Sequence, residues 1–160
     1  MILVDMNQVT ISNLMMQLGS KRDNELDGNM VRHMVLNSLR AYRSRFHDAF
    51  GEMVLCYDSR SYWRRDYFPN YKSNRKKDRA NSGLDWDTIF TTLNNLRDDI
   101  KEIFPYKVIE TEGAEADDVI GTLAEYSQTA GEGGGLFDDG TAIPFLVLSG
   151  DHDFNQADAA

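Results

Sequence analysis

The chain is poor in cysteine and proline, with one and three among its 160 residues, and from Glu110 onward it contains no lysine or arginine. A single cysteine excludes an internal disulfide, and Cys56 lies in an apolar run where a buried thiol is expected. No apolar run approaches the roughly 20 residues needed to cross a bilayer. No basic region precedes the first apolar run, so secretion and membrane insertion are unsupported. We expect a cytoplasmic protein.

What is present suits one folded domain. Apolar residues make up 41% of the chain and aromatic residues 11%, which suffices for one hydrophobic core. The length favours a single domain over residues 1–160. No internal repeat is visible.

Charge is segregated along the sequence. The chain carries 26 acidic and 17 basic residues, a formal charge of −9. Residues 60–79 nevertheless hold eight basic and two acidic residues, a local charge of +6, whereas the segment from Glu110 to the end holds twelve acidic residues. One part of the molecule can therefore attract phosphate while another can hold hard cations.

Three short apolar runs each lead to an aspartate. Such runs, separated by helical patterns, predict strands that are buried on both faces, as in the parallel sheets of α/β proteins. A weaker fourth strand is expected over residues 106–109. The three runs and their aspartates are residues 2–4 with Asp5, residues 53–57 with Asp58, and residues 145–148 with Asp151.

Helical spacing of apolar residues predicts helices over residues 30–46, 86–104 and 116–126. Asp85 is a candidate N-cap, and Pro105 ends the second helix. The order of elements predicts an open, mainly parallel α/β sheet with helices on both faces. Residues 19–28 are polar and loop-like, and we interpret the glycine-rich residues 129–142 as a surface loop rather than a nucleotide site.

Acidic residues are expected to converge at one edge of this sheet, because the carboxyl ends of parallel strands meet there. An isolated aspartate after a strand is often only a turn former or a helix cap. Seven carboxylates in this arrangement are hard to explain as separate turn formers or caps. A hard divalent ion would neutralise their charges. No Cys and His set has zinc spacing. The seven carboxylates are Asp5, Asp58, Glu115, Asp117, Asp118, Asp151 and Asp153.

Basic and aromatic residues alternate in residues 60–79, which we call the basic segment. Lys72, Arg75, Lys76 and Arg79 are spaced to form one stripe if they share a helix, which suits phosphate contacts. The alternative is a solvated helix face with aromatic residues buried beneath it. The rings that could stack on unpaired bases are Tyr62, Trp63, Tyr67, Phe68 and Tyr71.

Metal-binding carboxylates beside a cationic, stacking surface indicate phosphodiester chemistry. Two divalent ions about 4 Å apart can activate water and stabilise the leaving oxygen, so no covalent nucleophile is required.

The combination of motifs resembles the flap endonuclease or 5′-3′ exonuclease (5′-nuclease) family, and most closely its phage ribonuclease H branch. The resemblance runs over nearly the whole chain. It is carried by Leu3-Val4-Asp5, residues 54–58, Tyr62-Trp63-Arg64-Arg65-Asp66, Tyr71-Lys72 with Arg75, Glu115-Ala116-Asp117-Asp118, and Ser149-Gly150-Asp151 with Asp153-Phe154.

The resemblance implies a PIN-like N-terminal nuclease domain that depends on two Mg²⁺ ions, with Mn²⁺ as a substitute. All seven carboxylates would be metal ligands, directly or through water. Residues 60–80 would form a helical arch that binds the 5′ strand. Catalytic roles would fall to Asp5, Asp58, Arg64, Arg65, Lys72 and Arg75, and nucleic-acid contacts to Arg64, Arg65, Tyr71, Lys72, Arg75, Lys76 and Arg79.

The resemblance also implies the substrates and partners. They would be DNA and RNA-DNA hybrids with 5′ ends or flaps, cut during removal of RNA primers in DNA replication. The protein would act as a monomer, in the host cytoplasm if phage-encoded. Single-strand-binding or clamp proteins are candidate partners, and no membrane is involved.

One departure keeps other functions open. Family members continue past the Gly-Asp-x-Asp motif, here residues 150–153, with another acidic ligand and a duplex-binding helical module. This chain stops at Ala160, so we expect a C-terminally truncated chain without that module. The alternatives are a catalytically incomplete fragment that binds one metal ion and nucleic-acid ends, or a PIN-type single-strand ribonuclease. A phosphatase is weaker, because no Asp-x-Asp follows the first strand.

Overall fold

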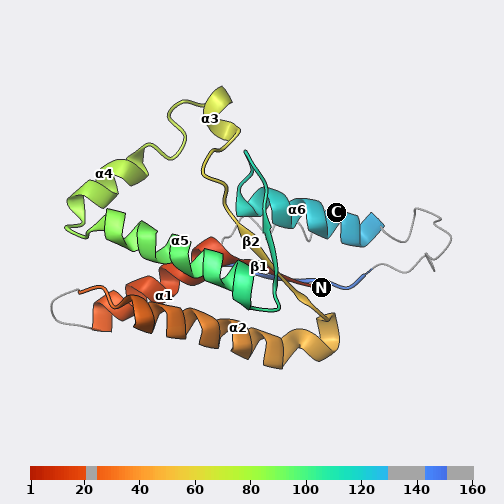
Figure 1. Cartoon of the computed structure of the whole chain (residues 1–160). Helices are drawn as coiled ribbons and strands as arrows, with labels where there is room; N and C mark the ends of the chain where they lie inside the picture. Colours follow the sequence, from red (N-terminus) through yellow and green to blue (C-terminus); the bar gives the residue numbers. More distant parts are fainter. Residues whose placement is uncertain (21–24, 130–142, 151–160) are drawn as a thin grey trace.

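The computed structural model describes residues 1–20, 25–129 and 143–150 of the chain (Figure 1). In these residues four parallel strands form one sheet. The strands stand in the order β3-β2-β1-β4, with Ile2 of β1 opposite Met53 of β2 and Leu146 of β4. The predicted α/β fold with a parallel sheet is confirmed. The strands are β1 (Ile2–Asp5), β2 (Met53–Tyr57), β3 (Lys107–Glu110) and β4 (Leu146–Leu148).

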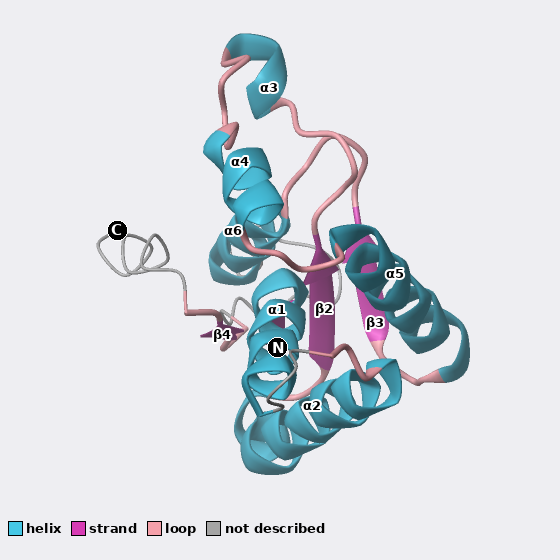
Figure 2. Cartoon of the chain, turned by 90° about the vertical axis from the view of Figure 1, so that its left-hand side faces the viewer, coloured by secondary structure: helices cyan, strands magenta, loops and turns pink. Residues whose placement is uncertain are grey.

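Helices cover both faces of this sheet (Figures 1 and 2). Side chains alternate along a strand, so each strand serves two cores. Val4 and Leu55 pack with α1, α2 and α5, whereas Leu3 and Cys56 pack against α6 on the other face. The helices are α1 (Met6–Ser20), α2 (Gly28–Phe50), α3 (Arg64–Tyr67), α4 (Asn74–Asn81), α5 (Trp86–Ile103) and α6 (Ala116–Thr129).

Local signals in the sequence start and stop the long helices. The side chain of Asp27 accepts a hydrogen bond from the Met30 backbone N–H, and that of Asp85 accepts one from Thr88, so both aspartates are N-caps. Gly51 ends α2 with φ of 80°, a left-handed conformation that glycine adopts readily. The three predicted helices are therefore present, with α2 longer at both ends than its apolar pattern.

Helix α1 was not predicted. It follows β1 directly at Met6, and its polar residues break any clear apolar stripe. Tertiary packing explains it, because Leu14 and Leu18 are buried against α2 and the sheet. Even Gln17 is buried, where its side chain donates to the Glu25 carbonyl and accepts from the Asp27 backbone N–H.

The strand order creates a switch point beside β1. The chain passes from β1 through β2 to β3 on one side, and then returns through α6 to place β4 on the other side of β1. Ligands of open α/β sheets bind at the carboxyl ends of strands at such a point. Asp5 is the last residue of β1 and lies there.

The glycine-rich segment 129–142 lies outside the described residues apart from the end of α6. No helix in the described part of the chain is both long and apolar enough to span a membrane.

Candidate active site

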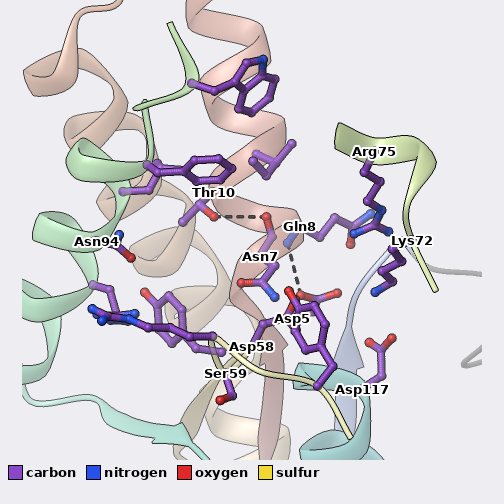
Figure 3. Close-up of a pocket in the computed structure, with 18 of the residues that line it drawn as sticks. Asp5, Asn7, Gln8, Thr10, Asp58, Ser59, Lys72, Arg75, Asn94 and Asp117 are labelled. Atoms are coloured by element: carbon purple, nitrogen blue, oxygen red, sulfur yellow. Dashed lines mark hydrogen bonds between the residues drawn. The ribbon is translucent and has the colours of Figure 1, made fainter. Parts of the chain in front are cut away.

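A cleft of about 1000 Å³ opens at the carboxyl edge of the sheet, between α1, α4, α5 and the start of α6 (Figure 3). Three of the predicted metal ligands, Asp5, Asp58 and Asp117, line it. Lys72 and Arg75 of the basic segment line the same cleft. The structure thus brings together acidic and basic residues that are far apart in the sequence.

Asp5 is fixed where β1 meets β4. Its carboxylate accepts hydrogen bonds from the backbone N–H of Gln8, at 3.2 Å, and from the hydroxyl of Ser149, at 3.0 Å. Only 7% of Asp5 is exposed. Ser149 follows β4, so this contact ties the carboxylate to the switch point.

Asp58 follows β2 and accepts a hydrogen bond from the backbone N–H of Ala116 at 2.8 Å. Burial raises the pKa of Asp58 above its ordinary value, and the charges of Glu115 and Asp5 raise it further. The Ala116 N–H and Lys72 act in the opposite direction. A carboxylate in such surroundings gains from a nearby cation.

Backbone contacts fix the loop after β2 against the loop before α6. The Ser59 N–H donates to the Ala114 carbonyl at 2.9 Å, and the Trp63 N–H donates to the Gly113 carbonyl at 2.8 Å. The Ser59 hydroxyl accepts from the Gly113 N–H at 3.2 Å. These contacts hold Asp58 and Glu115 on adjoining loops.

Glu115 is buried and receives hydrogen bonds from three residues of the basic segment. One carboxylate oxygen accepts from Arg64 and from the Tyr71 hydroxyl, both at 2.9 Å. The other oxygen pairs with Lys72. Only 2% of the Glu115 side chain is exposed, so this carboxylate joins the sheet edge to the basic segment.

Asp118 is directed differently from Asp117 and is absent from the cleft lining. Two nitrogens of Arg64 donate to its two oxygens, at 2.8 and 2.7 Å, and the Trp63 indole N–H donates at 3.2 Å. The hydrogen bond from Arg64 lowers the pKa of Asp118, and a further bond from the Glu115 backbone N–H acts in the same direction. Asp118 is thus held in an ion pair with the basic segment.

The predicted cationic stripe on a single helix is wrong. Lys72 has φ of 54°, in the left-handed region, and α4 begins only at Asn74. Lys72 therefore turns towards Glu115, while Arg75 and Arg79 approach the cleft from α4. Lys76 is exposed on α4.

The rings of this segment have several roles. Tyr62 lines the cleft, with the Arg65 guanidinium 4.9 Å from its ring centroid. Tyr71 uses its hydroxyl on Glu115. Tyr67 and Phe68 are 74% and 66% exposed, so their rings remain candidates for base stacking.

The acidic residues of the cleft offer carboxylate oxygens, which suit a hard cation, and no cysteine is among the described residues that line the cleft. Cys56 is buried, and burial raises the pKa of its thiol to about 12. Asp151 and Asp153 lie outside the described residues. Among the residues that are described, no three acidic, histidine or cysteine side chains form a group that could hold a metal ion.

The spacing of apolar residues predicted helix α5 but gave no role to its rings, and two of these rings line the cleft. Trp86 and Phe90 are one helical turn apart, and both belong to the cleft wall together with Tyr57 from β2. The polar residues Asn94 and Arg97 continue the same side of α5. The i, i+4 and i+8 spacing of Trp86, Phe90 and Asn94 was the available signal.

Two comparisons place these features among known proteins. The family model described as 5′-3′ exonuclease, N-terminal resolvase-like domain matches residues 1–158. The chain is also 32% identical over 157 residues to Ribonuclease H of Enterobacteria phage T4, across 96% of this chain and 47% of that protein. The chain thus spans about half the length of this relative. Both matches agree with the resemblance predicted from the motifs.

Proposed function

The chain belongs to the family of 5′-3′ exonuclease N-terminal, resolvase-like domains, and on this premise we propose that it acts as a metal-dependent, structure-specific 5′-nuclease. The observation that carries the proposal is the shared cleft. Asp5, Asp58 and Asp117 line it together with Lys72 and Arg75, so groups suited to a divalent cation and groups suited to phosphate face one volume.

Mg²⁺ is the proposed cofactor, with Mn²⁺ as a substitute, because every proposed ligand is a carboxylate. Two bound ions would supply an activated water and stabilise the leaving oxygen. The proposed ligands, direct or through water, are Asp5, Asp58, Glu115, Asp117, Asp118, Asp151 and Asp153.

The basic residues have two proposed roles. Lys72 and Arg75 bind and orient the phosphate at the cleft, because both line it. Arg64 and Tyr71 position the arch, residues 60–80, through Glu115. The other proposed phosphate contacts, outside these two groups, come from Arg65, Lys76 and Arg79.

The proposed substrates are DNA and RNA-DNA hybrids with 5′ ends or flaps, cut by exonuclease or flap endonuclease action. The relative's name, Ribonuclease H, supports a hybrid substrate. We propose RNA primer removal during replication as the role, residues 1–160 as a nuclease domain, and the host-cell cytoplasm as its location. We also propose that the protein is a monomer and that it works with single-strand-binding or clamp proteins.

A second candidate is a binding domain that holds nucleic-acid ends without cutting them. One observation favours it, namely that the described residues contain no ready group of three metal-ligating side chains. Under this hypothesis the basic residues of the cleft bind phosphate, and its carboxylates hold at most one metal ion.

Cleavage of labelled substrates separates the two candidates. A 5′-flap duplex, an RNA-DNA hybrid and a single-stranded RNA are incubated with the chain in Mg²⁺ or in EDTA. We expect the flap and the hybrid to be cut in Mg²⁺ alone, and Asp5→Asn to abolish cutting. Asp48→Asn, at a fully exposed carboxylate on α2, is the matched control.

The other outcomes are equally informative. Binding without cleavage would replace the nuclease by the binding domain. Cutting of single-stranded RNA without preference for a junction would instead favour a PIN-type ribonuclease.

A further inference from the structure

The part of the cleft formed by α5 is apolar and lined with rings. The rings of Trp86 and Phe90 lie 5.6 Å apart between centroids, at 39° to each other. Leu93 and, from α1, Ile11 extend this wall. Phe90 is 38% exposed, so a flat apolar group could reach its face.

Arg79 lies over this wall. Its guanidinium carbon is 5.8 Å from the ring centroid of Trp86 and 5.2 Å from that of Phe90. Aromatic faces and guanidinium planes are the two surfaces on which proteins stack nucleobases. Both kinds of surface occur here together, on α5 and α4.

A buried hydroxyl borders the same space. Tyr57 lines the cleft and is only 6% exposed, yet its phenolic oxygen has no hydrogen-bond partner within the described residues. Burying such a group unpaired is costly, so a ligand that bonds to it is favoured. Asn94, also in the cleft lining, adds amide donors and an acceptor.

Arg97 adds no unpaired positive charge to this end of the cleft. Arg97 is 12% exposed and pairs with Asp98 at 2.9 Å and with Glu110 at 3.6 Å, so its charge is already compensated. Lys72 is likewise paired, with Glu115, whereas the other cations that line the cleft, Arg60, Arg75 and Arg79, form no ion pair with a described residue. A ring-shaped group with a polar edge fits the apolar wall and the Tyr57 hydroxyl, while Arg79 can also contact the phosphate of the same nucleotide.

We propose that Trp86, Phe90, Arg79, Tyr57 and Asn94 form a nucleobase subsite, which receives one unpaired base of the substrate. The rings and Arg79 stack on the base, while Tyr57 and Asn94 bond to its edge. Asp5 and Asp58 line the same cleft, so the base is held within the volume where the backbone is cut. The inference rests on the proposed nuclease function.

Abasic substrates test the subsite. Flap duplexes that differ by one missing base, moved in turn through the nucleotides around the scissile phosphate, are compared for cleavage in Mg²⁺. Their affinities are compared in EDTA by fluorescence anisotropy. At one position we expect the missing base to weaken binding and kcat/KM by about 5- to 100-fold, the range for one stacked base.

Variants test whether the proposed subsite causes the difference between intact and abasic substrates. Phe90→Ala and Tyr57→Phe should bring the ratio between intact and abasic substrates towards one, and Phe90→Tyr should restore it. Tyr57→Phe removes only the unpartnered hydroxyl, so thermal melting should confirm an intact fold. Ile103→Ala, at a 67% exposed position on the same helix, is the control and should keep the wild-type ratio.

Three results separate the subsite from the nuclease. Equal use of intact and abasic substrates at every position would overturn the subsite and leave the nuclease standing. Unchanged discrimination in both variants would also overturn it. Base discrimination in EDTA that is lost in the variants, without cleavage in Mg²⁺, would support the subsite and overturn the nuclease.

Discussion

Two carboxylates at the same edge of the sheet, Asp58 and Asp118, have opposite electrostatic surroundings. Burial and neighbouring acidic groups raise the pKa of Asp58, whereas the hydrogen bond from Arg64 lowers that of Asp118. Asp58 lines the cleft, and Asp118 pairs with the basic segment. The difference shows that an acidic residue in a family motif can either line the cleft or pair with the basic segment.

The contrast extends from these two residues to two regions. The sheet is held by apolar packing on both faces, with Leu3, Val4 and Leu55 fully buried. Helix α3 has no buried residue, and neither has α4. The basic segment is attached through the ion pairs and hydrogen bonds at Glu115 and Asp118. We therefore expect substitutions at the cleft to affect catalysis and those at the attachment to affect the order of the arch.

Among the substitutions that test this contrast, Asp58→Asn should have the largest effect. Losing one proposed metal ligand removes several kcal/mol of transition-state stabilisation, so kcat/KM for a flap substrate should fall by about a thousand-fold. The melting temperature should stay near that of the wild type, because the substitution removes a charge that is unfavourable when buried. Asp118→Asn should lose clearly less activity. Equal losses in the two variants would contradict the division between the two acids.

Glu115→Ala tests the attachment directly. It leaves Arg64, Tyr71 and Lys72 without their shared acceptor, and removal of one partner from a buried pair costs about 3–5 kcal/mol. Arg64 and Lys72 are 25% and 21% exposed, so water offsets part of this cost. We expect the free energy of unfolding in urea to fall by about 2–3 kcal/mol. Glu112→Ala, at an exposed site on the same loop, should cost much less.

The pair between Arg64 and Asp118 should contribute a smaller amount. Both side chains are 25% exposed, so a double-mutant cycle with Arg64→Met and Asp118→Asn should give a coupling energy of about 1 kcal/mol. Hydrogen exchange over residues 60–80 should accelerate in each single variant. Exchange that stays at the wild-type rate would mean that the pair does not hold the arch.

The smallest effect is expected at Arg75, which is exposed on α4 and lines the cleft. Arg75→Ala should lower affinity for a flap duplex a few-fold in low salt. The slope of log K against log salt concentration should become shallower by about 1, as for one phosphate contact. Lys101→Ala, exposed near the end of α5, should leave that slope unchanged. A slope unaffected by Arg75→Ala would place the phosphate contact elsewhere.

Much of the fold could be predicted because its signals are local. Short apolar runs before Asp5 and Asp58 predicted buried parallel strands, and Asp85 with Pro105 bounded a helix. Helix α1 lacked such signals, because packing against α2 rather than periodicity stabilises it. The sequence therefore predicted the strands of the sheet better than the helical connection from β1 to β2, which includes α1.

The candidate site was predicted as a set of residue types, and the tertiary structure decided their directions. Sequence position alone put Asp117 and Asp118 in one motif, yet only Asp117 lines the cleft. Lys72 left its expected helix to reach Glu115, a residue 43 positions away. Trp86 and Phe90, which the sequence placed only within the apolar pattern of a helix, line the cleft wall.

The sequence by itself determined that strands end in aspartates at one edge of a parallel sheet, because a strand's length and its flanking residues are local properties. The structure alone decided which acid faces the cleft, which acid pairs with Arg64, and which rings border the cleft. These outcomes depend on where distant segments pack. Charge pairing and side-chain burial depend on distances between residues that are far apart in the sequence. No local pattern in the chain encodes such distances.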